Sequence, residues 1–238
     1  MNCYPQLKFG KGNAKLDKVI ATFSLPSGYA CPFAMDCLSK ADPVTGKIKD
    51  GPDTLFRCFA ASQEALYKPV RKARWHNFNL LRKCNSLKEM QDLIVKSLPK
   101  QEIVRIHVAG DFYCQRYFDA WLNVAKALPH KTFYAYTKSL PFVVNRLGAI
   151  PSNFKVIASR GGKHDNLIVQ HNLVYAEVVY SEREASELGL EIDHDDSHAI
   201  SGVKSFALLL HGTQPANTIA AEALKALRKQ GKGGYPRK

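Results

Sequence analysis

The sequence predicts an α/β fold: a single domain whose mostly parallel sheet forms a partial (β/α) barrel, similar to a TIM barrel, with helices outside. Two observations support this prediction. Segments rich in β-branched and aromatic residues alternate with segments of helical apolar spacing through the second half of the chain, an order typical of parallel sheets. Unusual polar residues follow the strand segments, where the loops of such folds hold their binding sites. An open, doubly wound sheet is the alternative interpretation.

The first half of the chain combines one expected strand with a helical region. Residues 17–25 are rich in β-branched and aromatic side chains and predict a strand, which the Pro-Ser-Gly sequence at 26–28 ends. The turn-rich residues 40–54 predict an exposed excursion. A helix is expected over residues 60–66, and Pro69 should break or restart it because proline lacks a backbone N–H.

The remaining elements alternate in type. Helical apolar spacing predicts helices over residues 71–83, 86–98, 115–127, 140–148, 181–188 and 217–229. Runs of β-branched and aromatic residues predict strands over residues 103–108, 132–136, 154–159, 173–179 and 205–210. We therefore expect one domain, residues 1–238, with a cysteine-bearing N-terminal part at about 17–84 and a basic tail at 231–238.

Basic residues exceed acidic ones. The chain has 34 lysines and arginines against 21 aspartates and glutamates, a net charge of +13. This excess favours nucleic acid or an anionic substrate as a partner, although a lysine-rich solvated face explains it equally well. The densest segment, residues 68–76, combines charge with the ring of Trp75 as single-strand binders do, whereas the commoner arrangement packs such a ring into the core.

The cellular setting follows from two absences in the sequence. No run of about 18 apolar residues is present, so no membrane span is expected. The N-terminus lacks the charged-then-apolar pattern of a secretory signal. We expect a cytoplasmic protein, in which thiols stay reduced.

Three cysteines dominate the functional interpretation. Cys31 and Cys37 lie in the loop after the first expected strand, and Cys58 follows the excursion. Soft thiolates grouped in this way, in a chain that looks intracellular, indicate a metal or cluster site more than a disulfide framework. The spacing differs from the C-x2-C of zinc ribbons and bacterial ferredoxins. Cysteines acting only as small buried hydrophobes are the less favoured alternative.

The fourth ligand is open at this stage. Cys84 is the first candidate, because it ends a helical region that starts shortly after Cys58. Cys114 is the second, because it follows the Gly110-Asp111 turn. A site without a fourth protein ligand would leave one iron open to a substrate, which suits catalysis.

Several other polar residues follow an expected strand directly. The candidate cofactor contacts are Asp111, Lys138, Arg160 and His211. Asp111 equally suits the capping of the following helix. His107, inside a strand, is expected to be a core histidine with satisfied hydrogen bonds. The acidic segment 193–198 is expected to be a solvated loop more than a metal site.

Four segments carry a family resemblance: Tyr29-Ala30-Cys31-Pro32, Asp36-Cys37-Leu38, Arg57-Cys58-Phe59-Ala60 and Arg74-Trp75-His76-Asn77-Phe78. Residues 105–112 and 135–139 give weaker support. In these segments the chain resembles a family of phage proteins named after a mycobacteriophage gene product, the gene-product-88 family. The resemblance implies a virus-encoded iron–sulfur protein, located in the host cytoplasm.

The layout also resembles that of radical S-adenosylmethionine enzymes, which carry a three-cysteine cluster loop after the first strand of a partial (β/α) barrel. Here the strand at 17–25 leads into Cys31 and Cys37 at the same topological place. The usual motif of that superfamily is C-x3-C-x2-C, whereas this chain has C-x5-C with the third cysteine far downstream. The resemblance implies a shared fold and leaves S-adenosylmethionine open as a co-substrate.

Three hypotheses follow. In the first, Cys31, Cys37 and Cys58 hold an iron–sulfur cluster, [4Fe-4S], in a protein with a redox or radical-enzyme-like role and an electron-transfer partner. Whether that role is enzymatic stays open. In the second, the thiols hold zinc in a nucleic-acid-binding protein. In the third, the chain is a metal-free α/β module with a partner-binding role.

Overall fold

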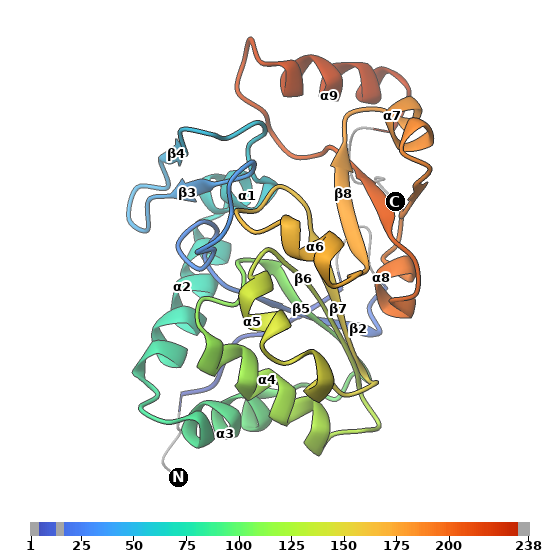
Figure 1. The fold of residues 1–238 in the computed structure, drawn as a ribbon. Helices are drawn as coiled ribbons and strands as arrows, with labels where there is room; N and C mark the ends of the chain where they lie inside the picture. The colour runs from blue at the N-terminus through green and yellow to red at the C-terminus, as the bar shows by residue number, and fades with distance from the viewer. Residues whose placement is uncertain (1–4, 13–16, 233–238) are drawn as a thin grey trace.

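The computed structural model describes residues 5–12 and 17–232. The strands of these residues are β1 (Gly10–Lys11), β2 (Ile20–Ser24), β3 (Ser39–Ala41), β4 (Ile48–Asp50), β5 (Ile103–Ala109), β6 (Thr132–Thr137), β7 (Phe154–Ser159), β8 (Tyr175–Val179), β9 (Glu191–Ile192) and β10 (Phe206–Leu209). The helices are α1 (Phe59–Leu66), α2 (Lys68–Lys83), α3 (Leu87–Ser97), α4 (Gln115–Ala127), α5 (Leu140–Val144), α6 (Asn166–Gln170), α7 (Glu182–Glu187), α8 (Ser197–Ser201) and α9 (Ile219–Lys229), with a 3-10 turn at Leu147–Ala149. Figure 1 shows their arrangement.

The main sheet has the strand order β1-β2-β5-β6-β7-β8-β10-β9, and β3 pairs with β4 in a separate hairpin. All pairs of the main sheet are parallel except β1 with β2. From β2 to β8 and on to β10, each strand is added on the same side of the one before it. The order therefore has no switch point, and the doubly wound alternative is wrong. Strands β1 and β9 are the edges of the sheet and do not pair with each other among the described residues.

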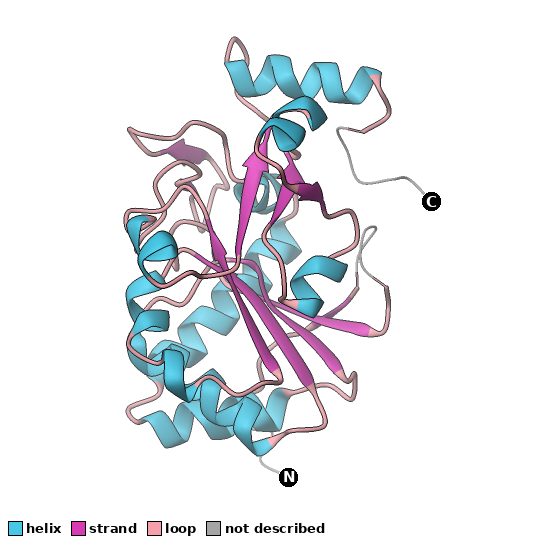
Figure 2. Ribbon diagram, turned by 45° about the vertical axis from the view of Figure 1, so that its right-hand side comes forward, coloured by secondary structure: helices cyan, strands magenta, loops and turns pink. Residues whose placement is uncertain are grey.

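Two apolar cores lie on opposite faces of this sheet. The larger core packs α2, α3 and α4 against β2, β5 and β6, and Trp121 and Phe23 are fully buried in it. The smaller core joins Tyr134 of β6 to Phe206 of β10. Figure 2 shows the strands fanning through the middle of the molecule between the helices.

The sheet is strongly curved. The rings of Tyr136 on β6 and Phe206 on β10 have centroids 6.0 Å apart, although β7 and β8 lie between these strands. On a flat sheet, strands three positions apart are separated by about 14 Å, because neighbouring strands lie about 4.8 Å apart. The inner face is therefore concave, which brings side chains of distant strands together.

A bulge in β5 decides which side chains face that concave side. The pairing of β2 with β5 jumps from Thr22–Arg105 to Ser24–Ala109, and His107 has φ of 67° within the jump. Its ring lies in the larger core, 4.5 Å from the ring of Phe112. Bulges re-aim side chains in this way. His107 is the expected core histidine, but its Nδ1 has no hydrogen-bond partner among the described residues.

The structure confirms a mixed α/β fold with a mostly parallel sheet, and it adds elements that the sequence did not predict. Pro69 lies in the first turn of α2, so it restarts the helix as expected. Most residues of the excursion at 40–54 are exposed or half-buried, but the excursion also contains most of the β3–β4 hairpin, in which Ala41 is fully buried. Strands β1 and β9 and helices α6 and α8 have two to five residues each, which is too short for a periodic signal.

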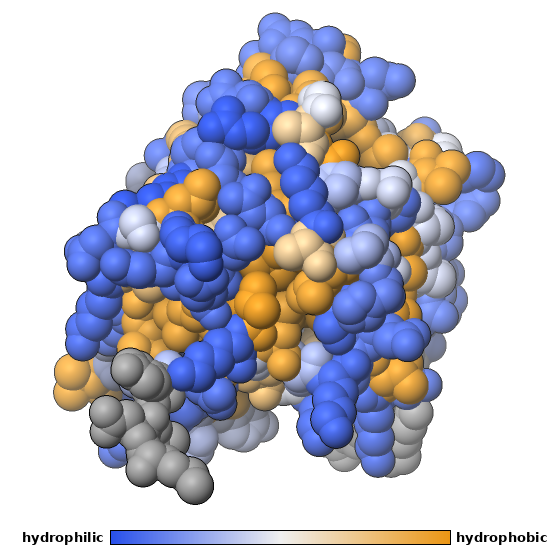
Figure 3. Space-filling model, turned by 90° about the horizontal axis from the view of Figure 1, so that it is seen from below, coloured by the Kyte–Doolittle hydropathy of each residue, from blue (hydrophilic) through white to orange (hydrophobic). Residues whose placement is uncertain are grey.

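Polar and apolar side chains share the outer surface. The view from below in Figure 3 shows apolar groups exposed between polar ones. Among the described residues, no helix has both the length and the apolar character that crossing a membrane requires.

Candidate functional site

A cavity of about 180 Å³ lies where the parallel strands end. Its lining includes Cys31, Cys37, Cys58 and three of the four candidate cofactor contacts, Asp111, Lys138 and His211. They come from the loops after β2, β5, β6 and β10 and from the start of α1. An apolar cavity of about 150 Å³ takes up a benzene molecule, so this one has room for a compact group.

The three thiols affect one another electrostatically. Burial raises the pKa of Cys31 well above its ordinary value, and the charges of Asp111, Cys58 and Cys37 raise it further. Burial also raises the pKa of Cys37, and burial together with the charge of Cys37 raises the pKa of Cys58 to about 12. In the bare protein these thiols are protonated at neutral pH, and a bound cation would reverse that preference.

Local backbone geometry places Cys31. The N–H of Gly28 lies 3.3 Å from the Cys31 sulfur, to which it donates. Gly28 has φ of +70°, and a Cβ at this position would lie 2.5 Å from the carbonyl oxygen of Ser39. Only glycine combines this left-handed conformation with the close approach. The donated hydrogen bond favours the thiolate form of Cys31.

Cys58 lies at the N-terminus of α1, where it is the residue before the first helical turn. The nearby backbone N–H groups of Ala60 and Ala61 lower its pKa against the larger effect of burial, although the sulfur accepts no capping hydrogen bond from the helix. Free N–H groups at a helix start stabilise a negative charge. The N–H of Cys58 donates to Ser39 Oγ at 3.2 Å, which links this cysteine to the segment after Cys37.

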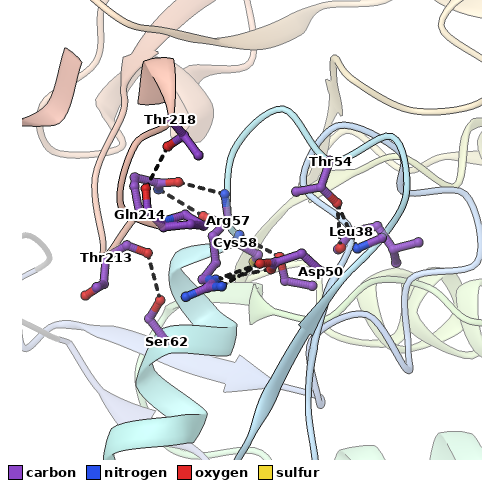
Figure 4. A network of polar contacts seen from close by, with 12 residues as sticks. Leu38, Asp50, Thr54, Arg57, Cys58, Ser62, Thr213, Gln214 and Thr218 are labelled. Carbon is purple, nitrogen blue, oxygen red and sulfur yellow. Dashed lines mark hydrogen bonds and ion pairs between the residues drawn. The ribbon is translucent and has the colours of Figure 1, made fainter. Parts of the chain in front are cut away.

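The loop after β10 is fastened to the residue before Cys58 (Figure 4). The amide of Gln214 accepts from the N–H of Arg57 at 2.7 Å and donates to its carbonyl at 3.1 Å. Arg57 in turn forms an ion pair with Asp50 of β4. Ser62 of α1 donates to the carbonyl of Thr213 at 3.3 Å. The α1 terminus is therefore held between the hairpin and the last strand.

A buried ion pair connects α1 with α2 and with the loop of Cys31. Glu64 accepts from Arg74 at 2.9 Å and from the backbone N–H of Ser27 at 2.9 Å. Both side chains of the pair are almost fully buried. Burial raises the pKa of Glu64, although Arg74 opposes that effect. The same carboxylate thus joins the helix that begins at Cys58 to the loop that carries Cys31.

Asp111 and Lys138 line the cavity and have several partners each. Asp111 accepts from the backbone N–H of Phe112 and of Lys138 at 2.7 and 2.8 Å and from the hydroxyl of Thr137 at 2.5 Å. Burial raises its pKa to about 6 despite these donors. Lys138 Nζ donates to Ser159 Oγ at 2.9 Å and to the carbonyl of Arg160. These bonds tie the ends of β5, β6 and β7 together.

The sequence did not indicate the charged pair at the inner face, Arg105 and Asp196. Their side chains are 2.5 Å apart, both line the cavity, and Asp196 is almost fully buried. Asp196 also accepts from the hydroxyls of Tyr134 and Tyr136. The solvated loop expected at 193–198 is wrong for this residue and for Asp193, which is also buried. The alternating pattern of β5 could have suggested that Arg105 faces inward.

Other candidate residues lie elsewhere. Cys84 is buried in the larger core, with its sulfur 3.6 Å from the Leu80 carbonyl oxygen, and Cys114 packs against the same core. The structure does not bring either cysteine to the cavity. Arg160 lies over the ring of Tyr175, 4.4 Å from its centroid, and outside the cavity lining.

Both arginines of the basic segment at 68–76 are buried within the fold. Arg71 is buried and donates to the carbonyls of Glu64, Pro43 and Val44. Trp75 packs against the larger core, as the commoner arrangement predicts. In the predicted basic tail, residues 233–238 lie outside the described residues, as does Cys3.

The donor set is not that of a single ion. Within residues 5–12 and 17–232, no three His, Cys, Asp or Glu side chains form a group that could hold one metal ion. The described cysteines are all free thiols.

Comparison with known proteins identifies the family. The family model described as Gene product 88 matches residues 6–230, so the chain belongs to the Gene product 88 family, and the phage-family resemblance is confirmed. The chain is 30% identical over 138 residues to the Gene 88 proteins of Mycobacterium phages D29 and L5. The match covers 53% of this chain and 50% and 51% of those proteins. The chain thus spans about half the length of the curated relatives it matches. No solved structure matches the chain.

Proposed function

We propose that this member of the Gene product 88 family is a virus-encoded iron–sulfur protein of the host cytoplasm, in which Cys31, Cys37 and Cys58 hold a [4Fe-4S] cluster. One observation carries the proposal. Thiols from two separate chain segments line one cavity at the ends of the parallel strands, and burial together with nearby negative charges disfavours their bare thiolate forms. A cationic group bound by the three cysteines would stabilise their thiolates.

The surroundings of the sulfur atoms suit such a cluster. The N–H of Gly28 donates to the sulfur of Cys31, and hydrogen bonds to sulfur tune the reduction potential of clusters. The N–H groups at the start of α1 lower the pKa of Cys58 against the larger effect of burial. Phe56 and Phe59 also line the cavity and limit the access of water. The cluster, when bound, would supply one-electron redox chemistry.

The donor geometry gives a single zinc ion no support. One zinc ion needs its ligands gathered around a single centre, and the described residues contain no such group. In a cluster each cysteine binds a different iron, so the sulfur atoms stand further apart. The zinc-stabilised nucleic-acid-binding protein also loses support because Arg71, a member of its basic segment, is buried within the fold.

The fold supports a partial (β/α) barrel for this protein. The strand order runs in one direction, the inner face is concave, and the cysteines follow β2, the first parallel strand. This is the arrangement that the likeness to radical S-adenosylmethionine enzymes implies. We propose a redox role, with radical-type chemistry as the variant in which one iron stays open to S-adenosylmethionine.

The residues around the cavity have roles of their own. Asp111 and Lys138 hold the ends of β5, β6 and β7 together, so this part of the cavity wall is fixed. The guanidinium group of Arg105 lines the cavity and is held at the inner face by its ion pair with Asp196.

The test is the metal content of protein that is purified without oxygen. We expect iron with matching acid-labile sulfide and an EPR signal after reduction. We also expect a broad absorption band at about 400 nm, which is typical of cysteine-ligated clusters. Adding S-adenosylmethionine to the reduced sample would change the EPR signal only if an iron is open. Zinc alone, or no metal, would contradict the proposal and direct attention to the nucleic-acid alternative.

A further inference from the structure

We infer that the exposed face of α2 binds single-stranded nucleic acid, with lysine and arginine side chains contacting phosphates and the ring of Tyr67 stacking on a base. The inference goes beyond the proposed function. No residue of α2 lines the cavity of the three cysteines, and the binding needs no metal.

One face of α2 gathers the exposed cations of that helix. We call it the basic face, and it consists of Lys68, Lys72, Arg82 and Lys83, with Asn79 between them. Because an α-helix has 3.6 residues per turn, these positions fall within about 100° of its circumference. At 1.5 Å per residue the face runs for about 21 Å, which is long enough for several nucleotides of an extended strand. Figure 1 shows α2 at the left edge of the molecule, below the β3–β4 hairpin.

The basic face has no acidic neighbours along its own helix. No acidic residue occurs between Glu64 and Glu89 in the chain. Lys68, Lys72 and Lys83 form no ion pair with any other residue that the structure describes. A polyanion would therefore meet uncompensated positive charge along the length of α2.

Helix stability does not account for this row of cations. Lys68 is the first residue of α2, where the helix macrodipole disfavours a cation, and the first turn holds no acidic residue. Lys72 lies one turn further on, so the two like charges repel each other. In α3, by contrast, Lys88 is paired with Asp92 four positions away. A bound polyanion would remove the repulsion within the basic face.

The β3–β4 hairpin borders the basic face. Nζ of Lys40 lies 5.4 Å from the centroid of the Tyr29 ring, and that ring packs against Trp75 of α2 with the centroids 4.8 Å apart. Lys40 therefore extends the positive surface beyond the helix. The charge of Asp42 also reaches Tyr29, but its carboxylate accepts hydrogen bonds from backbone N–H groups of the hairpin turn.

Tyr67 supplies an aromatic ring at one end of the basic face. It directly precedes Lys68 and is 57% exposed. Its side chain makes no hydrogen bond or ring contact with the residues that the structure describes. Trp75, by contrast, is covered by Tyr29 and packs against the larger core. Tyr67 is thus the ring of this region on which an unpaired base can stack.

A ring next to a row of cations favours a single strand over other polyanions. In a duplex the bases stack on one another and present only their edges in the grooves, so an exposed ring adds little to binding. An acidic protein would be attracted by the cations but has no base for Tyr67. Single strands offer both phosphates and unpaired bases, which is why their binding proteins combine basic grooves with aromatic side chains.

The first test measures the fluorescence anisotropy of a labelled oligothymidylate of about 15 nucleotides, near the largest site of one single-strand binding domain. The full chain, purified without oxygen, should bind it, and the affinity should fall as the salt concentration rises. Combining Lys68→Ala with Lys72→Ala should lower the affinity about tenfold and the salt slope by about 1.4, because each lost phosphate contact removes about 0.7. Lys225→Ala with Lys229→Ala, exposed lysines at the same spacing on α9, is the matched control and should leave binding unchanged.

The second test concerns the ring. Tyr67→Ala should weaken binding of the oligothymidylate about tenfold, because a base loses its stacking partner. Tyr67→Phe keeps the ring and should bind as the unsubstituted protein does. Circular dichroism of each variant measures its folding. Poly-L-glutamate and a DNA duplex serve as competitors for the unsubstituted protein, and each should displace the oligothymidylate only at a large excess.

Four outcomes overturn the inference. They are no binding of the oligothymidylate at low salt, equal affinities of the two double-lysine variants, an unchanged affinity of Tyr67→Ala, and competition by poly-L-glutamate at an equal concentration of charge. The last would indicate an acidic protein as the partner, and it needs only the unsubstituted protein. Iron and sulfide analysis of the same sample tests the cluster separately, so the two proposals can fail independently.

Discussion

Two groups of cysteines differ in their surroundings. Cys31, Cys37 and Cys58 line a cavity. The N–H of Gly28 donates to the sulfur of Cys31, and the N–H groups at the start of α1 lower the pKa of Cys58 against the larger effect of burial. Cys84 lies in an apolar core, and Cys114 packs against the same core. The comparison teaches that burial alone does not distinguish a ligand from a small hydrophobe. Polar contacts that position a thiol, and other thiols close by, are the distinguishing features.

The largest expected difference between the groups is in metal content. Replacing Cys37 by Ala should remove most of the bound iron, because the cluster loses one of its ligands. Replacing Cys84 by Ala should leave the iron content unchanged. Iron and sulfide analysis of the two variants, with Cys114→Ala as a second control, measures the effect. Equal iron in Cys37→Ala and Cys84→Ala would remove the distinction between the two groups.

The larger core contains a histidine that makes the fold sensitive to acid. Burial lowers the pKa of His107 to about 3 from an ordinary 6.5. Below pH 6.5 the unfolded chain binds a proton that the native His107 does not, so the free energy of unfolding falls as the pH drops from 6.5 toward 3. The contribution of His107 to this fall is about 5 kcal/mol, from about 1.4 kcal/mol per pKa unit.

The variant His107→Asn tests this contribution, because asparagine tolerates the left-handed backbone. Urea unfolding at several pH values should show a smaller loss of stability in acid than the unsubstituted protein shows. His171→Asn, at an exposed histidine, is the control. A pH dependence of His107→Asn equal to that of the control would show that His107 does not resist protonation.

The ion pair beneath the cysteine loop should matter more for stability than an exposed pair. Glu64→Ala leaves Arg74 buried without its partner and should cost about 3–5 kcal/mol. Asp92→Ala breaks the exposed pair with Lys88 and should cost no more than about 0.5 kcal/mol. Urea denaturation measures both. Similar costs for the two variants would mean that the buried pair does not hold the loop.

Losing the hydrogen bonds that hold the loop after β10 should have the smallest effect on stability. Gln214→Ala removes the hydrogen bonds to the backbone of Arg57 and should cost about 1–3 kcal/mol, because a half-buried N–H loses its partner. Gln170→Ala, at an exposed glutamine, is the matched control and should be neutral. Thermal unfolding of both variants gives the comparison. An unchanged midpoint in Gln214→Ala would show that water replaces the amide at no cost.

The sequence could predict the cysteine side of the site because it depends on local signals. A strand followed by Pro-Ser-Gly places Cys31 at the end of β2, and the same argument places Asp111 and His211 after β5 and β10. The register of parallel strands then brings these loops to one edge of the sheet. Periodicity and turn residues suffice for that inference.

The Arg105–Asp196 pair depends on long-range geometry. Its members are 91 positions apart and meet because Asp196, in the segment between β9 and α8, lies against the inner face of the curved sheet. Nothing in the acidic segment around Asp196 distinguishes a buried carboxylate from a solvated one. Helical spacing likewise predicted where α2 ends but not that Cys84 would face the core. Such features follow from tertiary packing, which propensity does not encode.

The most direct test of the cluster is a Mössbauer spectrum of protein that is produced with ⁵⁷Fe and purified without oxygen. A [4Fe-4S] cluster with three cysteine ligands and one other ligand predicts about four irons per chain, with one iron site distinct from the rest. That spectrum should be absent in Cys37→Ala and unchanged in Cys84→Ala. Protein without iron, or with the spectrum of isolated mononuclear iron, would contradict the assignment of Cys31, Cys37 and Cys58 as cluster ligands.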